Sequence, residues 1–164
     1  MDSASFRIGI GHDTHRLGEG GPLIIGGVTI EFDRHLVGHS DADVLLHAIT
    51  DALLGAAALG DIGELFPDTD PAHQGRDSAE MLRFAMDRVE AAGWRLVNLD
   101  CIVFAQLPKL SPHKAAIAER VAEILGAQAD QVGIKAKTGE HVGPVGRFEA
   151  IQAECVALLH RVRP

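Results

Sequence analysis

Residues 39–70, HSDADVLLHAITDALLGAAALGDIGELFPDTD, decide the fold. The middle of this stretch carries apolar residues at three- and four-residue spacing, which predicts a helix with one buried face. These residues are Val44, Leu45, Ala48, Ile49, Ala52, Leu53 and Ala56. The glycines, proline and aspartates of residues 60–70 then favour an ordered, acidic, turn-rich segment over a second helix.

Polar residues mark the start of this helix. Ser40 is the expected N-cap, and Asp43 follows three residues later in a capping-box-like arrangement. Asp41 and Asp43 also suit the positive end of the helix dipole. His39 and Ser40 would stand where free backbone amides can bind an anion, a role compatible with capping by Ser40.

His47 does not fit a plain core helix, because it lies among Leu45, Leu46 and Ala48. Asp43 lies one turn earlier on the same face. A histidine beside an apolar face is usually a hydrogen-bonded structural residue, and that interpretation stands beside a functional one until other parts of the chain are considered.

Composition limits the classes of function. The chain has 164 residues, which is enough for one domain spanning residues 1–164 and too few for two domains that each have a sizeable core. A net charge of −8 argues against a nucleic-acid backbone as partner, and 4% aromatic residues argue against a base-stacking platform. A phosphorylated small molecule remains possible if cations are localised at its site.

Location is predicted from cysteines and the first residues. Cys101 and Cys155 lie in apolar strand-like runs and are expected to be buried free thiols in a reducing compartment. The N-terminal residues lack the apolar region of a signal peptide, and no apolar run approaches membrane-spanning length. A cytoplasmic protein is the simplest expectation.

The N-terminal segment offers metal-ligand chemistry. Residues 6–12 predict a strand, and Asp13 and His15 follow it two residues apart, so in an extended chain they point to the same side. Together with His47 they form a carboxylate and two imidazoles, a common set for a catalytic zinc with an open fourth position. The spacing alone is weak, and for Asp13 and His15 by themselves a solvent-facing strand end is the better interpretation.

The remaining elements alternate between strands and helices. Strands are expected over 23–32, with a bulge at Gly26 and Gly27, and over 94–106 and 131–140. Helices are expected from Asp77 or Ser78 to Gly93 and over 112–125. Residues 151–162 favour a strand, with a helix as the alternative. The fold class is therefore α+β, close to α/β, with helices packed on one side of a mixed sheet.

Several motifs, in order and well spaced, resemble the 2-C-methyl-D-erythritol 2,4-cyclodiphosphate synthase family. They are GHDTH at 11–15, the long run from 39 to 71, AQLPKLSPH at 105–113, KTGE at 137–140 and GR at 146–147. The resemblance covers nearly the whole chain. It makes the metal interpretation of Asp13, His15 and His47 the favoured one.

The resemblance implies a reaction and its cofactors. The substrate would be 4-diphosphocytidyl-2-C-methyl-D-erythritol 2-phosphate, whose 2-phosphate attacks the β-phosphorus to give the cyclic diphosphate and CMP. Zn²⁺ on Asp13, His15 and His47 would offset phosphate repulsion. Mg²⁺ or Mn²⁺ near Glu140 would bridge the diphosphate. Catalysis would then rest on positioning and charge stabilisation, without a protein nucleophile.

The resemblance also implies residue roles. His39 and Thr138 would be the catalytic residues that stabilise the pentavalent transition state. Residues 61–63 would hold the methylerythritol unit, residues 66–70 would line the same region, and residues 105–111 and 137–140 would form the cytidine and phosphate pocket. The implied substrate-binding residues are Asp13, His15, His39, Ser40, Asp61, Ile62, Gly63, Phe66, Pro67, Asp68, Thr69, Asp70, Ala105, Gln106, Leu107, Pro108, Lys109, Leu110, Ser111, Lys137, Thr138, Gly139, Glu140, Pro144 and Arg147.

The family is a homotrimer with sheets around a central channel, and the same assembly is expected here, with active sites between subunits. The chain departs from the family pattern at Gly139, where a threonine is usual, and at Phe148, which is bulky. A zinc-dependent hydrolase or phosphodiesterase is the alternative enzyme. A non-catalytic nucleotide-binding or trimeric scaffold is the alternative outside enzymes, although a scaffold has no use for the metal ligands.

Overall fold

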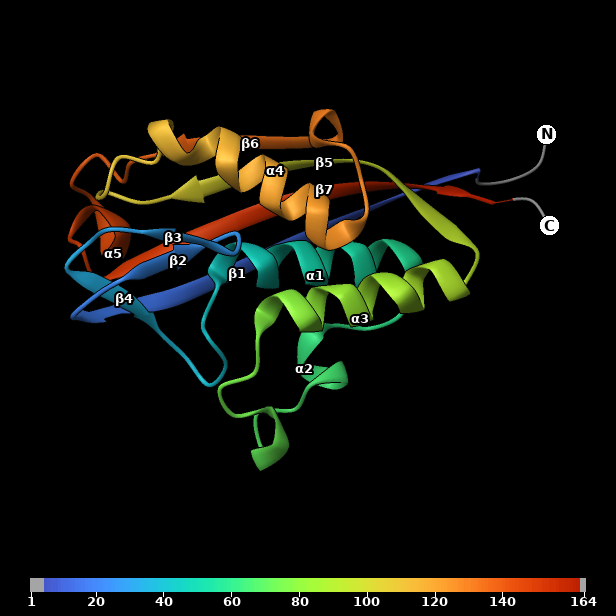
Figure 1. Cartoon of the computed structure of the whole chain (residues 1–164), viewed down its shortest axis with the longest axis horizontal. Coiled ribbons are helices and arrows are strands. Elements are labelled where there is room, and N and C mark those ends of the chain that lie inside the picture. Colours follow the sequence, from blue (N-terminus) through green and yellow to red (C-terminus); the bar gives the residue numbers. More distant parts are fainter. Residues whose placement is uncertain (1–4, 163–164) are drawn as a thin grey trace.

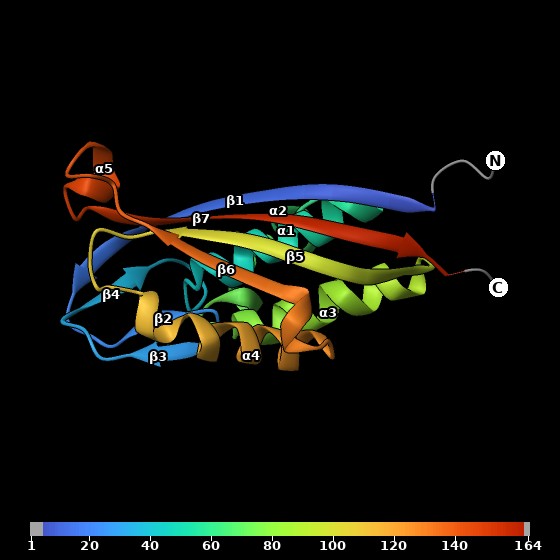
Figure 2. The same cartoon turned by 90° about the horizontal axis from the view of Figure 1, so that it is seen from above.

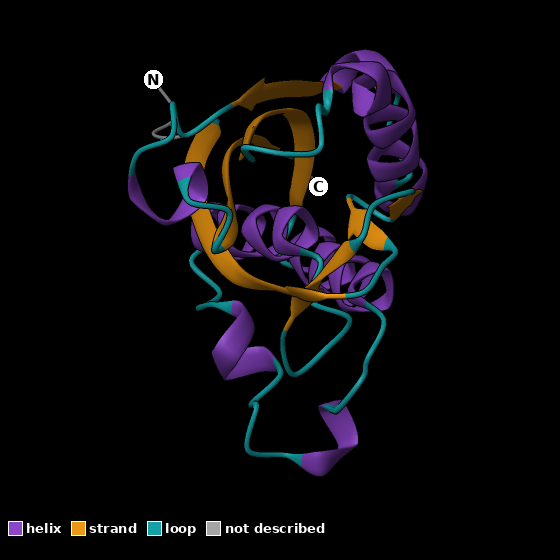
Figure 3. Ribbon diagram, turned by 90° about the vertical axis from the view of Figure 1, so that its left-hand side faces the viewer, coloured by secondary structure: helices purple, strands orange, loops and turns teal. Residues whose placement is uncertain are grey.

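A five-stranded mixed sheet carries the three long helices on one side in the computed structural model, which describes residues 5–162 (Figures 1 and 2). The strand order is β4-β1-β7-β5-β6, and only the β5–β6 pair is parallel. Seen from the end, the strands form a curved layer beside the helices (Figure 3). The predicted α+β layer of helices against one sheet is confirmed.

The elements alternate along the chain as the sequence pattern requires. The strands are β1 (Phe6–Glu19), β2 (Leu23–Ile25), β3 (Val28–Ile30), β4 (Arg34–Val37), β5 (Trp94–Phe104), β6 (Val132–Lys137) and β7 (Ala150–Arg161). The helices are α1 (Val44–Ala57), α2 (Ile62–Leu65), α3 (Ser78–Ala91), α4 (Lys114–Leu125) and α5 (Gly143–Gly146). Single 3₁₀ turns are η1 (Pro71–His73), η2 (Ser111–His113) and η3 (Ala129–Gln131).

Two glycines of β1 allow α1 to lie unusually close to the sheet. A Cβ atom at Gly9 would overlap the carbonyl oxygen of Ala52, and one at Gly11 would overlap that of Ala48. The facing stripe of α1 is alanine, so neither element has side chains that would hold the backbones apart. This close approach places the side chains that follow Gly11 on β1 next to the first turn of α1.

Alternation along β1 separates a covered face from an open one. The side chains of Asp13 and His15 fall on the same face as Gly9 and Gly11, toward α1, as predicted. Ile8 and Ile10 fall on the other face and are 74% and 71% exposed. The open face of the sheet is thus apolar along the first part of β1 and becomes polar from His12 onward.

The predicted N-cap of α1 is wrong. Asp43, not Ser40, caps the helix, and its side chain accepts hydrogen bonds from the amides of Leu45 and Leu46. The same carboxylate accepts from Gly26 and Gly27 at 2.9 and 2.7 Å. Burial raises the pKa of Asp43, while these amide bonds act in the opposite direction. Asp43 is the better cap because it serves two segments at once.

Three further predictions need correction. The first strand does not end at residue 12 but continues to Glu19, because β4 pairs with its second half. Residues 23–32 form a tight hairpin, β2–β3, instead of one bulged strand: Gly26 and Gly27 both have positive φ, which turns the chain. Residues 60–70 include one short helix, α2, started by the Asp61 cap.

The other predicted strands and helices are present, although the strand predicted over 131–140 ends at Lys137. Asp77 caps α3, whose Met81, Leu82, Ala85 and Val89 are buried, and residues 151–162 belong to a strand, not a helix. Cys101 and Cys155 are directly opposite each other on β5 and β7 and are both buried and free. The hydrogen bond between these thiols and their burial raise the pKa of Cys155. Within residues 5–162, none of the helices has the length and apolar character needed to cross a bilayer.

Candidate metal centre and substrate pockets

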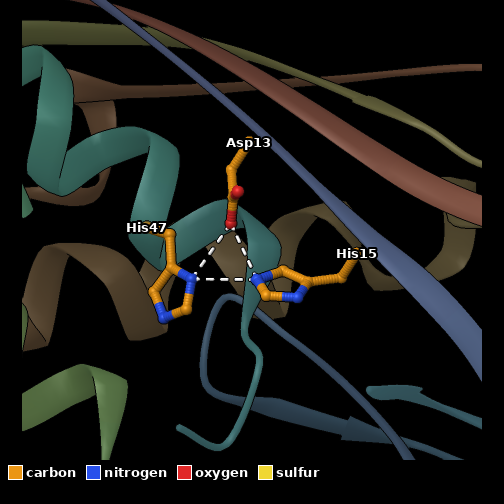
Figure 4. Close-up of side chains that lie close together, drawn as sticks. All are labelled: Asp13, His15 and His47. Atoms are coloured by element: carbon orange, nitrogen blue, oxygen red, sulfur yellow. Dashed lines mark hydrogen bonds and ion pairs between the residues drawn. The ribbon is translucent and has the colours of Figure 1, made fainter. Parts of the chain in front are cut away.

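Three side chains from β1 and α1 converge on one point (Figure 4). Asp13 Oδ2 lies 2.9 Å from His15 Nε2 and 3.0 Å from His47 Nδ1. The two ring nitrogens are 3.1 Å apart. The side chains are only 11–27% exposed, so the three atoms face one another in a partly dehydrated space.

A backbone carbonyl fixes the tautomer of His15. Its Nδ1 lies 3.0 Å from the oxygen of Val37, at the end of β4. A carbonyl oxygen only accepts, so Nδ1–H must be the donor. In the neutral ring, Nε2 then presents a lone pair to Asp13 and His47.

Two hydroxyl groups meet the outer nitrogen of His47. Its Nε2 lies 2.8 Å from Ser78 Oγ and 3.1 Å from Ser40 Oγ. The Ser78 hydroxyl forms a short hydrogen bond to Asp41 Oδ1, and the Ser78 amide donates to Asp41 Oδ2 at 3.0 Å. Since a carboxylate only accepts, the Ser78 hydroxyl proton goes to Asp41, which leaves Oγ to accept from His47 Nε2–H.

The centre can hold a cation. With both rings neutral, these tautomers turn two nitrogen lone pairs and a carboxylate oxygen toward one another. Burial opposes charge on both Asp13 and His15, yet the hydrogen bond that forms when His15 is protonated lowers the pKa of Asp13 and raises the pKa of His15, so the space favours a positive charge. Ligand atoms of a tetrahedral zinc stand about 3.3–3.5 Å apart. The observed separations are a few tenths of an ångström shorter, so the residues fit such an ion.

A cavity of about 310 Å³ opens beside this centre. Its lining joins His15 and His47 to seven residues predicted for substrate binding or catalysis, namely His39, Ser40, Ile62, Gly63, Phe66, Pro67 and Asp68. Phe66 anchors this wall: its ring lies 5.7 Å from that of Phe84, and the Arg76 guanidinium covers it at 4.8 Å. His73 and Met81 also line the cavity, and sequence reasoning missed both.

A second cavity of about 280 Å³ lies between the loop after β5 and the end of β6. The predicted residues that line it are Ala105, Gln106, Pro108, Lys109, Leu110, Ser111, Lys137 and Thr138, joined by Ala136. Just beyond it, Glu140 and His141 both have positive φ, so the chain reverses sharply after Thr138. The Thr138 hydroxyl donates to Glu140 Oε1 at 3.2 Å.

The two cavities share no lining residue, so the predicted site is divided within one chain. Glu140 does not belong to the Asp13–His15–His47 group. Asp61 and Asp70 serve as local caps, for Glu64 and Ala72, and Arg147 pairs with Glu149 at 2.8 Å. Thr69, Leu107, Gly139 and Pro144 line neither cavity. Asp41 and Ser78, which hold His47, were also missed: a buried serine at a helix start looks in sequence like any capping residue.

Comparison with known proteins gives one consistent family. The family model described as the YgbB family matches residues 6–160. A 2-C-methyl-D-erythritol 2,4-cyclodiphosphate synthase of Bordetella pertussis is 59% identical over 156 residues, covering 95% of this chain and 96% of the relative. The synthase of Gemmatimonas aurantiaca is 54% identical over 149 residues, with 91% and 90% covered.

Solved structures agree with this result. The bifunctional IspDF of Campylobacter jejuni is similar with a TM-score of 0.93 and 42% identity over 97% of this chain, which corresponds to 43% of that longer chain. A CDP complex of IspF from Plasmodium falciparum has a TM-score of 0.86 at 32% identity and covers 99% of this chain and 100% of its own. A CDP-bound form of a 2C-methyl-D-erythritol-2,4-cyclodiphosphate synthase has a TM-score of 0.86 at 43% identity.

Proposed function

The chain belongs to the YgbB family, that of the 2-C-methyl-D-erythritol 2,4-cyclodiphosphate synthases, and we propose that its two cavities together hold one substrate of that enzyme. The reaction is a lyase step of isoprenoid biosynthesis. A 2-phosphate oxygen of 4-diphosphocytidyl-2-C-methyl-D-erythritol 2-phosphate bonds to the β-phosphorus, the bond from that phosphorus to the bridging oxygen breaks, and CMP leaves.

One observation carries the assignment of the chemical centre: three acceptor atoms face one another beside a cavity and can hold a cation. Asp13, His15 and His47 would hold Zn²⁺. When bound, such an ion acts as a Lewis acid toward phosphate oxygens and offsets the repulsion between them. His39 and Ser40 line the cavity beside it and would donate hydrogen bonds to the phosphate bound there.

The second cavity would receive the cytidine end. The loop of residues 105–111 supplies backbone groups that can recognise a base edge without aromatic stacking. Lys137 and Thr138 lie at its rim and would hold and orient phosphate oxygens, with Thr138 donating its hydroxyl at the reacting diphosphate. Glu140 would bind Mg²⁺ or Mn²⁺, which prefer oxygen ligands shared between a carboxylate and phosphates.

In a homotrimer, the cavity beside the metal centre of one subunit could lie next to the second cavity of a neighbouring subunit. Because the cavities of one chain have separate linings, a bridging substrate calls for the cavity of a neighbouring subunit. The open face of the sheet, with Ile8 and Ile10 exposed, offers apolar surface for such an assembly around a central channel. We infer that each active site pairs the metal centre of one subunit with the loops of the next.

Phosphorus NMR of the purified protein with the cytidyl substrate, zinc and Mg²⁺ tests the function directly. The expected products are the cyclic diphosphate and CMP. A linear phosphate product would indicate the zinc-dependent hydrolase instead, and absence of turnover in a zinc-loaded protein would indicate a scaffold.

Removal of one ligand tests the metal assignment. His47→Ala should remove most of the zinc while the fold remains, since the buried apolar residues of α1 are untouched. Zinc sites of about four ligands contribute about 10–16 kcal/mol in all, so losing one ligand should weaken binding by about a hundredfold or more. A His47→Ala protein that retains full zinc would overturn this assignment.

A further inference from the structure

Asp41 and Ser78 form a relay that fixes the metal-facing side of His47. His47 Nε2–H reaches Ser78 Oγ at 2.8 Å, and the Ser78 hydroxyl and amide both bind the carboxylate of Asp41. Ser78 is only 1% exposed, so water does not compete for its hydroxyl. The relay joins three segments that are distant in sequence: the loop before α1, α1 itself and the start of α3.

We propose that Asp41 and Ser78 are positioning residues that keep the Nδ1 lone pair of His47 pointed at the metal centre and thereby set its metal affinity. This inference rests on the proposed function, because it presumes that Asp13, His15 and His47 bind a metal. Outer partners of metal-bound histidines fix the ring and its tautomer, and losing one costs about ten- to a hundredfold in affinity.

The two histidines differ in the hydrogen-bond acceptor of the ring nitrogen that points away from the proposed metal, which is Nδ1 in His15 and Nε2 in His47. This difference makes the relay testable. His15 donates to the backbone oxygen of Val37, which no substitution removes. His47 depends on side chains, with Ser78 at 2.8 Å and Ser40 at the longer distance of 3.1 Å. Ser40 Oγ also accepts from the Ala42 amide at 3.2 Å, so it is a shared and weaker partner.

Backbone hydrogen bonds around Asp41 also fix the position of α3 relative to the proposed metal centre. The Asp41 amide donates to the oxygen of Arg76 at 3.2 Å, and the Gly75 amide donates to the oxygen of His39 at 2.8 Å. Four hydrogen bonds therefore tie residues 39–41 to residues 75–78. This bracing keeps Ser78 within reach of His47 and prevents the hydroxyl from turning toward another acceptor.

Zinc affinity of the full chain, measured by competition with a chromophoric chelator, is the test. Ser78→Ala should bind zinc ten- to a hundredfold more weakly than wild type. Asp41→Asn should also weaken zinc binding, because its single amide oxygen cannot accept from both the Ser78 hydroxyl and the Ser78 amide, as the two Asp41 oxygens do. Long-range ¹⁵N–¹H spectra of the zinc-free protein should show the Nε2–H tautomer of His47 in wild type and a mixture in Ser78→Ala.

Asp77→Ala is the matched control. Asp77 caps the same helix by accepting from Ala79 at 2.8 Å but does not touch His47. It should lower the denaturant midpoint of unfolding, as loss of a cap does, and leave zinc affinity within twofold. If Ser78→Ala binds zinc as wild type does with an unchanged tautomer, or if Asp77→Ala loses as much affinity, the relay is wrong. A wild-type protein that binds no zinc would instead overturn the proposed metal centre.

Discussion

The metal centre and the loops of the second cavity differ in how completely one chain prepares them. At the centre, the ring nitrogen of each histidine that points away from Asp13 is hydrogen-bonded, in His15 to the oxygen of Val37 and in His47 to the Ser78 hydroxyl. The side chains of the centre are largely buried. In the loops, Lys137, Thr138 and Glu140 are exposed, and the hydrogen bonds of Thr138 and Glu140 are made to each other. Within the described residues, the side chains of the centre are thus held by partners from other segments, whereas Thr138 and Glu140 bond only locally.

The cause of this difference lies in the packing beneath each half. Asp13, His15 and His47, the candidate metal ligands, stand on β1 and α1, which lie close together because Gly9 and Gly11 let α1 approach β1. The loops extend from the ends of β5 and β6 (Figure 2). Under the proposed function, the groups that need fixed geometry stand on the packed core, and the groups that recognise the substrate stand on the loops.

The largest expected effect comes from disrupting the proposed assembly. Ile10→Asp places a charge on the open face of the sheet, where the side chain is 71% exposed in the single chain. Burying an unpaired charge between subunits costs about 3 kcal/mol or more, so the trimer should dissociate and turnover should fall by about a hundredfold. Zinc content should not change, because the centre is complete within one chain.

Sedimentation equilibrium, zinc analysis and a CMP-release assay on Ile10→Asp decide this point. A fully active monomer would contradict the division of the site between subunits. Loss of zinc together with activity would show instead that the metal centre also depends on assembly.

The second prediction concerns the close packing of α1 against β1, on which Asp13, His15 and His47 stand. Gly11→Ala introduces a Cβ that would overlap the Ala48 carbonyl, so α1 must move away from β1. Overpacking of this kind costs about 1–3 kcal/mol of unfolding free energy. Because His47 moves with α1 and Asp13 stays on β1, zinc affinity should fall as well. Denaturant unfolding and chelator competition measure the two effects.

Gly55→Ala is the control for this variant. Gly55 is an exposed residue of the same helix, and a Cβ there meets no atom within 4 Å. Alanine should raise stability by about 0.5–1 kcal/mol through helix propensity and leave zinc affinity unchanged. Equal zinc affinities in Gly11→Ala and Gly55→Ala would show that helix approach does not set the metal geometry.

The third prediction concerns the exposed half. Glu140→Gln removes the charge proposed to bind Mg²⁺ or Mn²⁺ but keeps the shape of the side chain. Loss of a contact to a charged group costs about 1.5–3 kcal/mol, so the response of turnover to added Mg²⁺ should weaken by about ten- to a hundredfold. Zinc content and assembly should match wild type. Loss of zinc, or an unchanged response to Mg²⁺, would refute the role of Glu140.

Sequence reasoning reached the ligands of the centre but not their support. Asp13 and His15 could be placed on one face from the period of a strand, and His47 was conspicuous on an apolar helix. The cap was misplaced at Ser40 because Asp43 gains its advantage from Gly26 and Gly27, which only the tertiary fold brings near. The strand β4 was missed because four residues carry too little pattern, and it forms by pairing with β1.

The smallest expected effect is a dependence of zinc affinity on pH. The pKa of His15 is raised above its ordinary value of about 6.5 by its hydrogen bond to Asp13, although burial acts in the opposite direction. In the zinc-free protein this contributes stability that is present below pH 6.5 and is lost as the pH rises through the folded pKa.

Zinc affinity depends on pH in the opposite direction from this stability. His15 must be neutral to bind the metal, so below its folded pKa one proton leaves for each zinc that binds, and affinity should fall about tenfold for each pH unit lost. Asp13, whose pKa is held low by His15 and His47 against the effect of burial, stays charged and adds no slope near neutrality. Chelator competition at several pH values measures this slope, and a zinc affinity that is constant from pH 6 to 8 would mean that His15 does not bind the ion.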